Sequence, residues 1–153
     1  MSEEMINIFN PVLIIEDEED HARLIINALT DGGKMVNEVI HINNGEDAMN
    51  YLLKNCENDT DKHSLPALIL LDVKMPLKNG FEVLEELKAN EKLKKIPVVM
   101  LTTTSTSDDI AKAMILGAND YIVKPVKFSD FMDKVSKIGY YWGMVSDVKK
   151  IFS

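Results

Sequence analysis

Short runs of Val, Ile and Leu alternate with longer amphipathic stretches along this chain. Runs that are apolar throughout are typical of parallel strands that are buried on both faces and joined by crossover helices. The alternation therefore predicts an α/β fold with a doubly wound, five-stranded parallel sheet. The predicted strands cover residues 12–15, 38–42, 68–71, 98–101 and 121–123.

The stretches between these runs carry the spacing and the end signals of helices. Gly32 and Gly33 follow the first stretch and Gly117 follows the fourth, at positions where helices commonly end. The four predicted helices cover residues 20–29, 46–53, 81–89 and 108–116. A last helix is expected from residue 128 onward, because its apolar residues share one helical face: Phe131, Val135, Ile138, Trp142 and Val145.

Length and composition predict one domain with a single core. The chain has 153 residues, of which 46% are hydrophobic and 27% are charged, as in an ordinary globular domain. We expect residues 1–10 to be an N-terminal extension, 11–138 the main domain and 139–153 a C-terminal helical extension of the same domain. The polar residues 55–64 predict an exposed loop and not a linker between domains.

Charge and hydropathy limit the expected partners and compartment. The net charge of −8 argues against direct nucleic-acid binding, because the lysines are scattered among acids. No apolar stretch approaches the roughly 20 residues that span a bilayer, so no membrane partner is expected. Cys56 is the only cysteine and cannot form an internal disulfide. These features predict a cytoplasmic protein.

Polar residues follow four of the five predicted strands directly. Glu16 and Asp17 follow the first strand, and Asp72 follows the third. Thr102 follows the fourth strand, and Lys124-Pro125 follows the fifth. Because the carboxyl ends of parallel strands meet at one edge of a sheet, these side chains are expected to converge in one shallow site.

The residue types at this edge predict phosphoryl chemistry with a metal ion. Clustered carboxylates repel one another, and a hard divalent cation such as Mg²⁺ with oxygen ligands removes that cost. Asp72 can then act as a nucleophile and form an acyl phosphate. We expect Lys124 to pair with one phosphoryl oxygen and the Thr102 hydroxyl to hydrogen-bond another.

Several segments in this order resemble the response-regulator receiver family: IIED, LILLDVKMP followed by Asn79-Gly80, VVMLTTT, and GANDYIVKP. The resemblance extends from about residue 12 to about residue 138. It implies a flavodoxin-like (βα)5 fold of the CheY-like superfamily, with strand order 2-1-3-4-5. It also implies a two-component switch, not a conventional enzyme, that catalyses its own phosphorylation from the phosphohistidine of a sensor histidine kinase and its own dephosphorylation.

The resemblance assigns roles to individual residues. It implies that Asp72 is the phosphoacceptor and that Thr102 and Lys124 complete the phosphate site. It further implies that Tyr121 is the switch aromatic and that the Lys124–Pro125 peptide bond is cis. The implied ligands of Mg²⁺ (or Mn²⁺) are Glu16, Asp17, Asp72 and the backbone carbonyl of Lys74.

Three residues depart from the common pattern of the family. Glu16 stands where many members have Asp, Lys74 where a smaller polar group is frequent, and Thr103 where Ala or Ser is frequent. We hypothesise that Lys74 and Thr103 tune the lifetime of the phosphoryl group because both border the access route. Unchanged autodephosphorylation in Lys74→Asn and Thr103→Ala variants would refute this.

The output of such a chain is expected to be a protein contact, because only about fifteen residues follow the receiver pattern. The tail contains Tyr140, Tyr141, Trp142 and Met144. It can pack on its own core, or it can extend the last helix as a surface for a downstream partner or a homodimer; both readings stay open. These features make the chain resemble stand-alone receivers that are associated with phytochrome-type histidine kinases.

The same residues are open to readings as other classes of protein. An aspartyl phosphohydrolase generally has a second acid two residues after the nucleophile, where this chain has Lys74. A receiver-like module that binds partners constitutively is expected to lack one of the acids, Thr102 or Lys124. A flavodoxin-like FMN protein would not place acids after its first strand.

Single residues also have structural readings: Glu16 and Asp17 as first-turn acids of a helix, Thr102 as a loop or cap residue, and Tyr121 as a plain strand former. His21, His41 and His63 lack ligand-like spacing, so no transition-metal site is expected.

Overall fold

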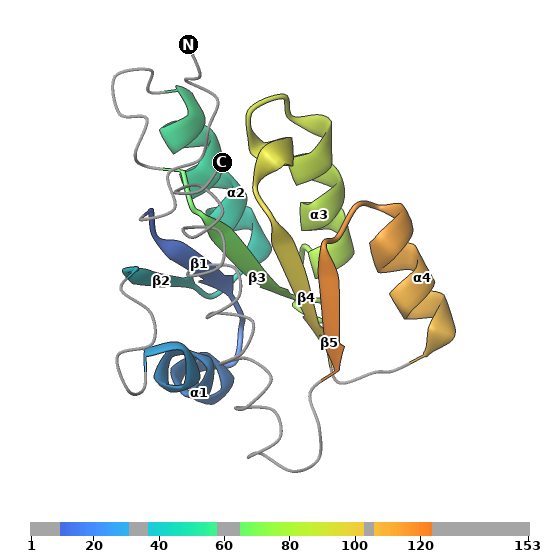
Figure 1. The fold of residues 1–153 in the computed structure, drawn as a ribbon, viewed down its shortest axis with the longest axis horizontal. Coiled ribbons are helices and arrows are strands. Elements are labelled where there is room, and N and C mark those ends of the chain that lie inside the picture. The colour runs from blue at the N-terminus through green and yellow to red at the C-terminus, as the bar shows by residue number, and fades with distance from the viewer. Residues whose placement is uncertain (1–9, 31–36, 58–64, 103–105, 124–153) are drawn as a thin grey trace, which may run out of the picture.

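The computed structural model describes residues 10–30, 37–57, 65–102 and 106–123. Helices and strands alternate along these residues as predicted (Figure 1). The elements are β1 (Val12–Ile15), α1 (Glu19–Thr30), β2 (Val39–Ile42), α2 (Gly45–Glu57), β3 (Leu68–Asp72), α3 (Gly80–Ala89), the 3-10 helix η2 (Leu93–Lys95), β4 (Val98–Thr102), α4 (Ser107–Ile115) and β5 (Asp120–Val123). The predicted last helix, the 139–153 extension and the Lys124–Pro125 peptide bond lie outside the described residues.

The five strands form one parallel sheet in the order β2-β1-β3-β4-β5. This is the predicted order 2-1-3-4-5 of a flavodoxin-like sheet. Strand β2 is added on one side of β1, whereas β3, β4 and β5 are added on the other side. The order of the strands therefore reverses between β1 and β3, which are parallel neighbours with Ile15 opposite Leu71. In doubly wound sheets ligands bind beyond the carboxyl ends of the strands at such a point.

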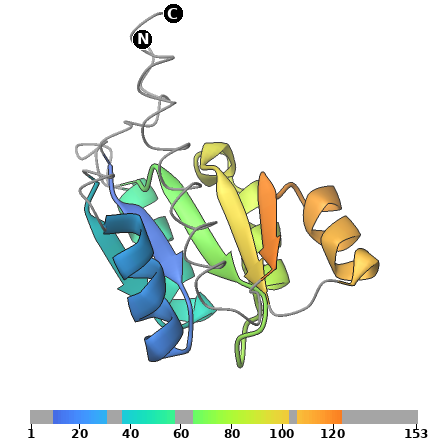
Figure 2. The same cartoon turned by 60° about the horizontal axis from the view of Figure 1, so that its bottom comes forward.

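Each face of the sheet has its own apolar cluster, because successive side chains of a strand point to opposite faces. The helices divide accordingly, with α1 on one face and α2 and α3 on the other (Figure 2). One cluster joins strand residues to α2 and α3: Leu13, Ile15, Ile69, Leu71, Val98, Met100, Ala48, Leu52, Leu84 and Leu87. The other joins strand residues to α1: Val12, Ile14, Leu68, Leu70, Val99, Leu101, Ile122, Ile25 and Leu29. Burial on both faces explains why the central strands are apolar up to their carboxyl ends.

Strands β3 and β4 each extend one residue past their predicted carboxyl ends, and β5 begins one residue earlier than predicted. Asp72 and Thr102 continue the ladders of β3 and β4, where they lie opposite Leu101 and Val123. Backbone pairing does not depend on the polarity of the side chain, so a hydrophobic pattern ends before the strand does. The two predicted site residues are therefore fixed by the sheet itself.

The ends of α3 and α4 are fixed by side-chain caps. The Asn79 side chain accepts from the Glu82 N–H, and the Glu82 side chain accepts from the Asn79 N–H, so that α3 begins with a capping box. The Thr106 side chain caps α4 by accepting from the Asp109 N–H. The cap of this helix is thus Thr106 and not Thr102, which belongs to β4.

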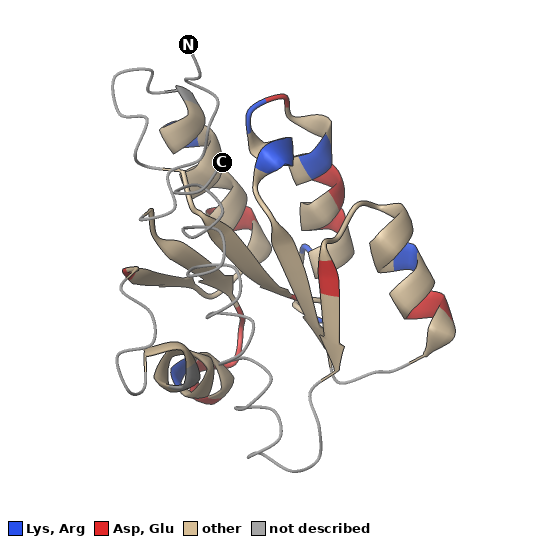
Figure 3. Cartoon of the chain, in the orientation of Figure 1, with Lys and Arg blue, Asp and Glu red and all other residues tan. Residues whose placement is uncertain are grey.

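Charge is distributed unevenly over the two ends of the sheet (Figure 3). Acidic residues lie on the chain directly after β1, whereas lysines gather on η2 and in the last turn of α3, where β4 begins. Among the described helices, none has the length and apolarity that crossing a membrane requires.

Candidate functional site

Three carboxylates lie together at the carboxyl ends of β1 and β3. Glu16 and Asp17 follow β1, and Asp72 is the last residue of β3. One oxygen atom from each of these residues can be chosen so that all three atoms lie within 4.8 Å of one another. The cause is the register of the sheet: Ile15 lies opposite Leu71, so the next residue of each strand brings Glu16 beside Asp72. The convergence of these acids was predicted from their positions after the strands.

Glu16 is fully buried although its side chain is acidic. Its side chain is 0% exposed, and burial of a carboxylate is costly unless polar groups surround it. The Glu18 N–H donates to Glu16 Oε2 at 3.2 Å, and His21 Nδ1 lies 4.0 Å from Glu16 Oε1. Since α1 begins at Glu19, neither Glu16 nor Asp17 is a first-turn residue of the helix.

Asp17 is the acid whose protonation the cluster perturbs. Burial raises the pKa of Asp17 above its ordinary value, and the neighbouring Glu16 raises this pKa further through a hydrogen bond and its charge. A hydrogen bond with Asp72 acts in the opposite direction and is weaker. A hard divalent cation with oxygen ligands would offset the repulsion that disfavours ionisation of Asp17 beside Glu16. The donor set of carboxylate oxygens fits Mg²⁺ or Mn²⁺.

The segment that leads from β3 into α3 holds Asp72 in place. The Val73 N–H donates to the Leu101 carbonyl at 2.9 Å, and the Gly80 N–H donates to the Val73 carbonyl at 2.8 Å. Gly80 lies so close that a Cβ atom at this position would be 2.2 Å from the backbone oxygen of Asp72. Only glycine fits there. The sequence showed Asn79-Gly80 as part of a motif but gave no sign of this contact.

The loop between β3 and α3 turns sharply after Lys74. The Lys78 N–H donates to the Pro76 carbonyl at 2.8 Å, and Leu77 between them has φ 69°. This is a three-residue γ-turn with its central residue in the left-handed region. The Leu77 side chain is 91% exposed. The Lys74 side chain is also exposed, and the predicted role of its carbonyl as a metal ligand stays a prediction.

Thr102 lies on the strand next to Asp72. It is fully buried, ends β4 and lies opposite Val123, the last residue of β5. Lys124 comes directly after Val123 in the sequence; Lys124, Pro125 and Thr103 lie outside the described residues. Tyr121 on β5 is partly buried, lies opposite Met100 and packs against the cluster on the α2–α3 face. Its role as a switch stays a prediction.

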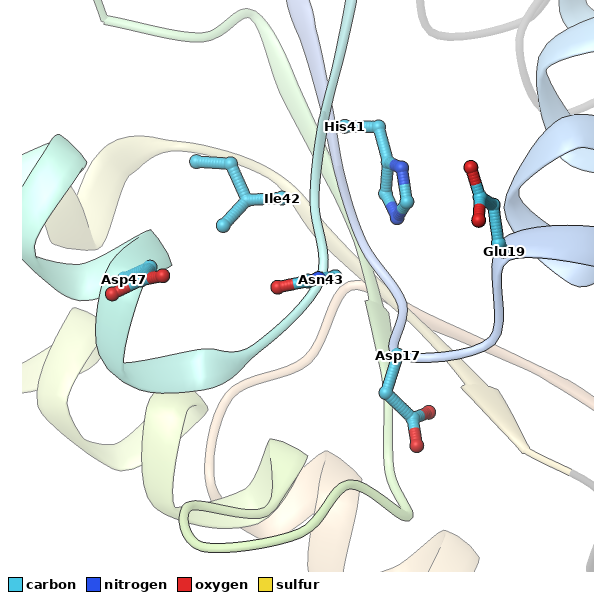
Figure 4. Close-up of a pocket in the computed structure, with 6 residues that line it drawn as sticks. All are labelled: Asp17, Glu19, His41, Ile42, Asn43 and Asp47. Atoms are coloured by element: carbon cyan, nitrogen blue, oxygen red, sulfur yellow. The ribbon is translucent and has the colours of Figure 1, made fainter.

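Two histidines approach the acids although their sequence spacing did not indicate it. His21 on α1 has its Nε2 atom 3.3 Å from Oε2 of Glu18, the residue before the helix. His41 on β2 donates from Nε2 to the Glu16 carbonyl at 2.8 Å. His41 also lines an open hollow of about 560 Å³ beside the acid site (Figure 4). The contact joins His41 on β2 to Glu16, the residue after β1, which lies 25 positions earlier in the chain, so no local pattern could reveal it.

Comparison with known proteins agrees with this arrangement. The family model of the response regulator receiver domain matches residues 12–136. Response regulator Rcp1 of Synechocystis is 36% identical over 131 residues, which cover 86% of this chain and 87% of Rcp1. The probable methanogenesis regulatory protein FilR2 of Methanothrix harundinacea is also 36% identical over 131 residues, covering 86% of this chain and 82% of that protein.

Solved structures show the same similarity. The phosphorylated cyanobacterial phytochrome response regulator RcpA has a TM-score of 0.77 and 38% identity, over 87% of this chain and 93% of RcpA. The Mn²⁺-bound form of Rcp1 has a TM-score of 0.77 and 34% identity, over 87% of this chain and 94% of that one. The predicted resemblance to phytochrome-associated receivers is therefore confirmed. With its five-stranded sheet in the order 2-1-3-4-5 and three acids at the switch point, the chain belongs to the response regulator receiver family.

Proposed function

We propose that this chain is a phosphorylation switch in which Asp72 accepts a phosphoryl group from the phosphohistidine of a sensor histidine kinase. The observation that carries the proposal is the cluster of Glu16, Asp17 and Asp72 within 4.8 Å at the carboxyl edge of the sheet. A carboxylate beside two further acids that can hold Mg²⁺ has the surroundings that covalent phosphoryl transfer requires. The Mn²⁺-bound and phosphorylated states of the similar structures support this proposal.

In the proposed reaction an Asp72 carboxylate oxygen attacks the phosphorus atom of the phosphohistidine. A P–O bond forms while the P–N bond of the donor breaks, and the imidazole leaves with the bonding electron pair. The cation, when bound, neutralises charge shared between the carboxylates and the phosphoryl oxygens. Glu16 and Asp17 would hold it from the β1 side, with the Lys74 carbonyl as a further ligand.

The neighbouring strands supply the remaining groups of the proposed site. The Thr102 hydroxyl, at the end of the strand beside Asp72, hydrogen-bonds one phosphoryl oxygen, and Lys124 pairs with another. Movement of Thr102 toward the phosphoryl group leaves room beside β5, and Tyr121 turns inward. This rearrangement changes the surface that a downstream protein recognises. Hydrolysis of the acyl phosphate by water returns the switch to its starting state.

The partners of the proposed switch are proteins of the cytoplasm. They are a sensor histidine kinase as donor and a downstream protein, or a second copy of the chain bound through the last helix and residues 139–153. The net charge of −8 supports the expectation that nucleic acid is not a direct partner.

The test is the intact mass of the protein after incubation with acetyl phosphate and Mg²⁺. We expect a gain of one phosphoryl group, about 80 Da, on a single aspartate. The gain should disappear in an Asp72→Asn variant and in the presence of EDTA. An adduct of the same mass on Asp72→Asn would refute Asp72 as the acceptor.

A further inference from the structure

We propose that His41 is a positioning residue for the metal-binding acids. It restrains the peptide unit between Glu16 and Asp17. This inference rests on the proposed function, because it concerns the same site. The contact that carries it is the hydrogen bond from His41 Nε2 to the Glu16 carbonyl oxygen at 2.8 Å. A carbonyl oxygen only accepts, so the ring carries a proton on Nε2.

The Glu16 carbonyl belongs to the peptide unit that leads into Asp17. Rotation of this unit changes ψ of Glu16 and φ of Asp17, and these two dihedrals place Asp17 relative to β1 and therefore relative to Glu16. A donor that fixes the carbonyl therefore restrains the position of one proposed metal ligand beside the other. His41 touches neither carboxylate through this bond, so it acts on the metal site through the main chain.

The neighbouring peptide unit is held by the same strand. The Glu16 N–H donates to the Ile42 carbonyl at 3.2 Å. The paired residues of β1 and β2 end with Ile15 opposite Ile42, so the Glu16 carbonyl lies beyond the last pair of the ladder. A side chain is needed to reach it, and His41 provides the donor. Both peptide units of Glu16 are thereby anchored to β2.

The sheet itself gives no packing reason for a histidine at this position. His41 lies opposite Ile14 and between Ile40 and Ile42 on β2, and an aliphatic residue would suit such a strand. The ring is only partly buried and points to the side of the sheet that α1 covers, beside Glu19 (Figure 4). The ring donates a hydrogen bond to the carbonyl that directly precedes Asp17. Such outer partners of a metal site typically change metal affinity by 10–100-fold when they are lost.

The experiment compares the affinity for Mg²⁺ alone, measured by calorimetric titration, in wild type and four variants. His41→Leu removes the donor, whereas His41→Gln keeps an N–H donor on a side chain of similar reach. Val39→Ala is the matched control, because Val39 lies on the same face of β2 and packs on the α1-side cluster. Asp17→Asn tests the metal site itself. A second readout, which needs no metal, is the NMR shift of the Asp17 amide, whose peptide unit includes the Glu16 carbonyl.

We expect His41→Leu to weaken Mg²⁺ binding by about tenfold and to shift the Asp17 amide signal in metal-free protein. His41→Gln should restore most of the affinity, and Val39→Ala should lower thermal stability while leaving the affinity unchanged. Wild-type affinity in His41→Leu would overturn the inference, and so would an equal loss in Val39→Ala. If Asp17→Asn binds Mg²⁺ as wild type does, the proposed metal site fails and this inference fails with it. If Asp17→Asn loses Mg²⁺ binding and His41→Leu does not, only the role of His41 is refuted.

Discussion

Neutralising Asp17 should make the metal-free protein more stable. The acid lies within 4.8 Å of both Glu16 and Asp72. Two unit charges at this separation repel by about 0.9 kcal/mol in water and by about 3.5 kcal/mol at an effective dielectric constant of about 20. Because Asp17 is only partly buried, solvent screens the repulsion and the lower figure applies. The hydrogen bond with Asp72 favours the charged form of Asp17, so we expect Asp17→Asn, which removes the repulsion from Glu16, to raise the free energy of unfolding by about 1 kcal/mol.

The assay is thermal unfolding in EDTA at neutral pH, where this gain corresponds to a rise in Tm of about 2–4 °C for a domain of this size. The pH dependence follows from the raised pKa of Asp17. An acid whose pKa is raised by folding binds its proton more tightly in the folded state, so wild-type stability falls as pH rises from 3.8 through the raised value. The advantage of Asp17→Asn should therefore vanish below pH 3.8 and be complete above the raised pKa of Asp17.

In the presence of Mg²⁺, wild type should become more stable than Asp17→Asn. A ligand that binds only the folded state stabilises it by an amount that grows with its concentration, and Asp17→Asn removes one proposed ligand. The exposed acid Glu85 on α3 provides the control, since Glu85→Gln changes the net charge equally but lies away from the cluster. Equal stabilisation by Glu85→Gln, or a lower Tm of Asp17→Asn in EDTA, would refute repulsion within the cluster as the cause.

Three further changes test how the scaffold holds the site. Gly80→Ala should destabilise the protein by about 1–3 kcal/mol and slow phosphorylation by acetyl phosphate. The reason is that the alanine Cβ would lie 2.2 Å from the Asp72 carbonyl oxygen. Wild-type stability of this variant in urea unfolding would contradict the close packing. Asn79→Ala removes the α3 cap and should cost about 1 kcal/mol in urea unfolding, whereas no loss would mean that the capping box contributes nothing. Leu84→Ala, in the core on the α2–α3 face, should cost about 2–5 kcal/mol with an unchanged m-value; a smaller cost would show that this core relaxes around the cavity.

The elements and their order could be predicted because both depend on periodicity along the chain. The buried strand β1 is apolar throughout, and β3 and β4 are apolar up to their last residue. Residues at the carboxyl ends of parallel strands share one edge, so the meeting of Glu16, Asp17 and Asp72 followed from sequence. The contact of His41 with the Glu16 carbonyl could not be predicted, since it depends on the side-by-side placement of β2 and β1. The left-handed Leu77 was also missed, because a leucine gives no signal for positive φ.

Repulsion between the three acids destabilises the metal-free protein and at the same time favours the binding of a cation. A buried Glu16, a partly buried Asp17 and a buried Asp72 would relax apart if their backbones were free, because like charges repel. They are prevented from doing so by main-chain anchors: β2 holds the peptide units of Glu16, and Gly80 packs against the carbonyl of Asp72. Rigid anchors keep the repulsion in the metal-free state, so that a cation relieves it on binding. Loosening any anchor should therefore weaken metal binding more than it weakens the fold, since the sheet beneath is held by its own two apolar clusters.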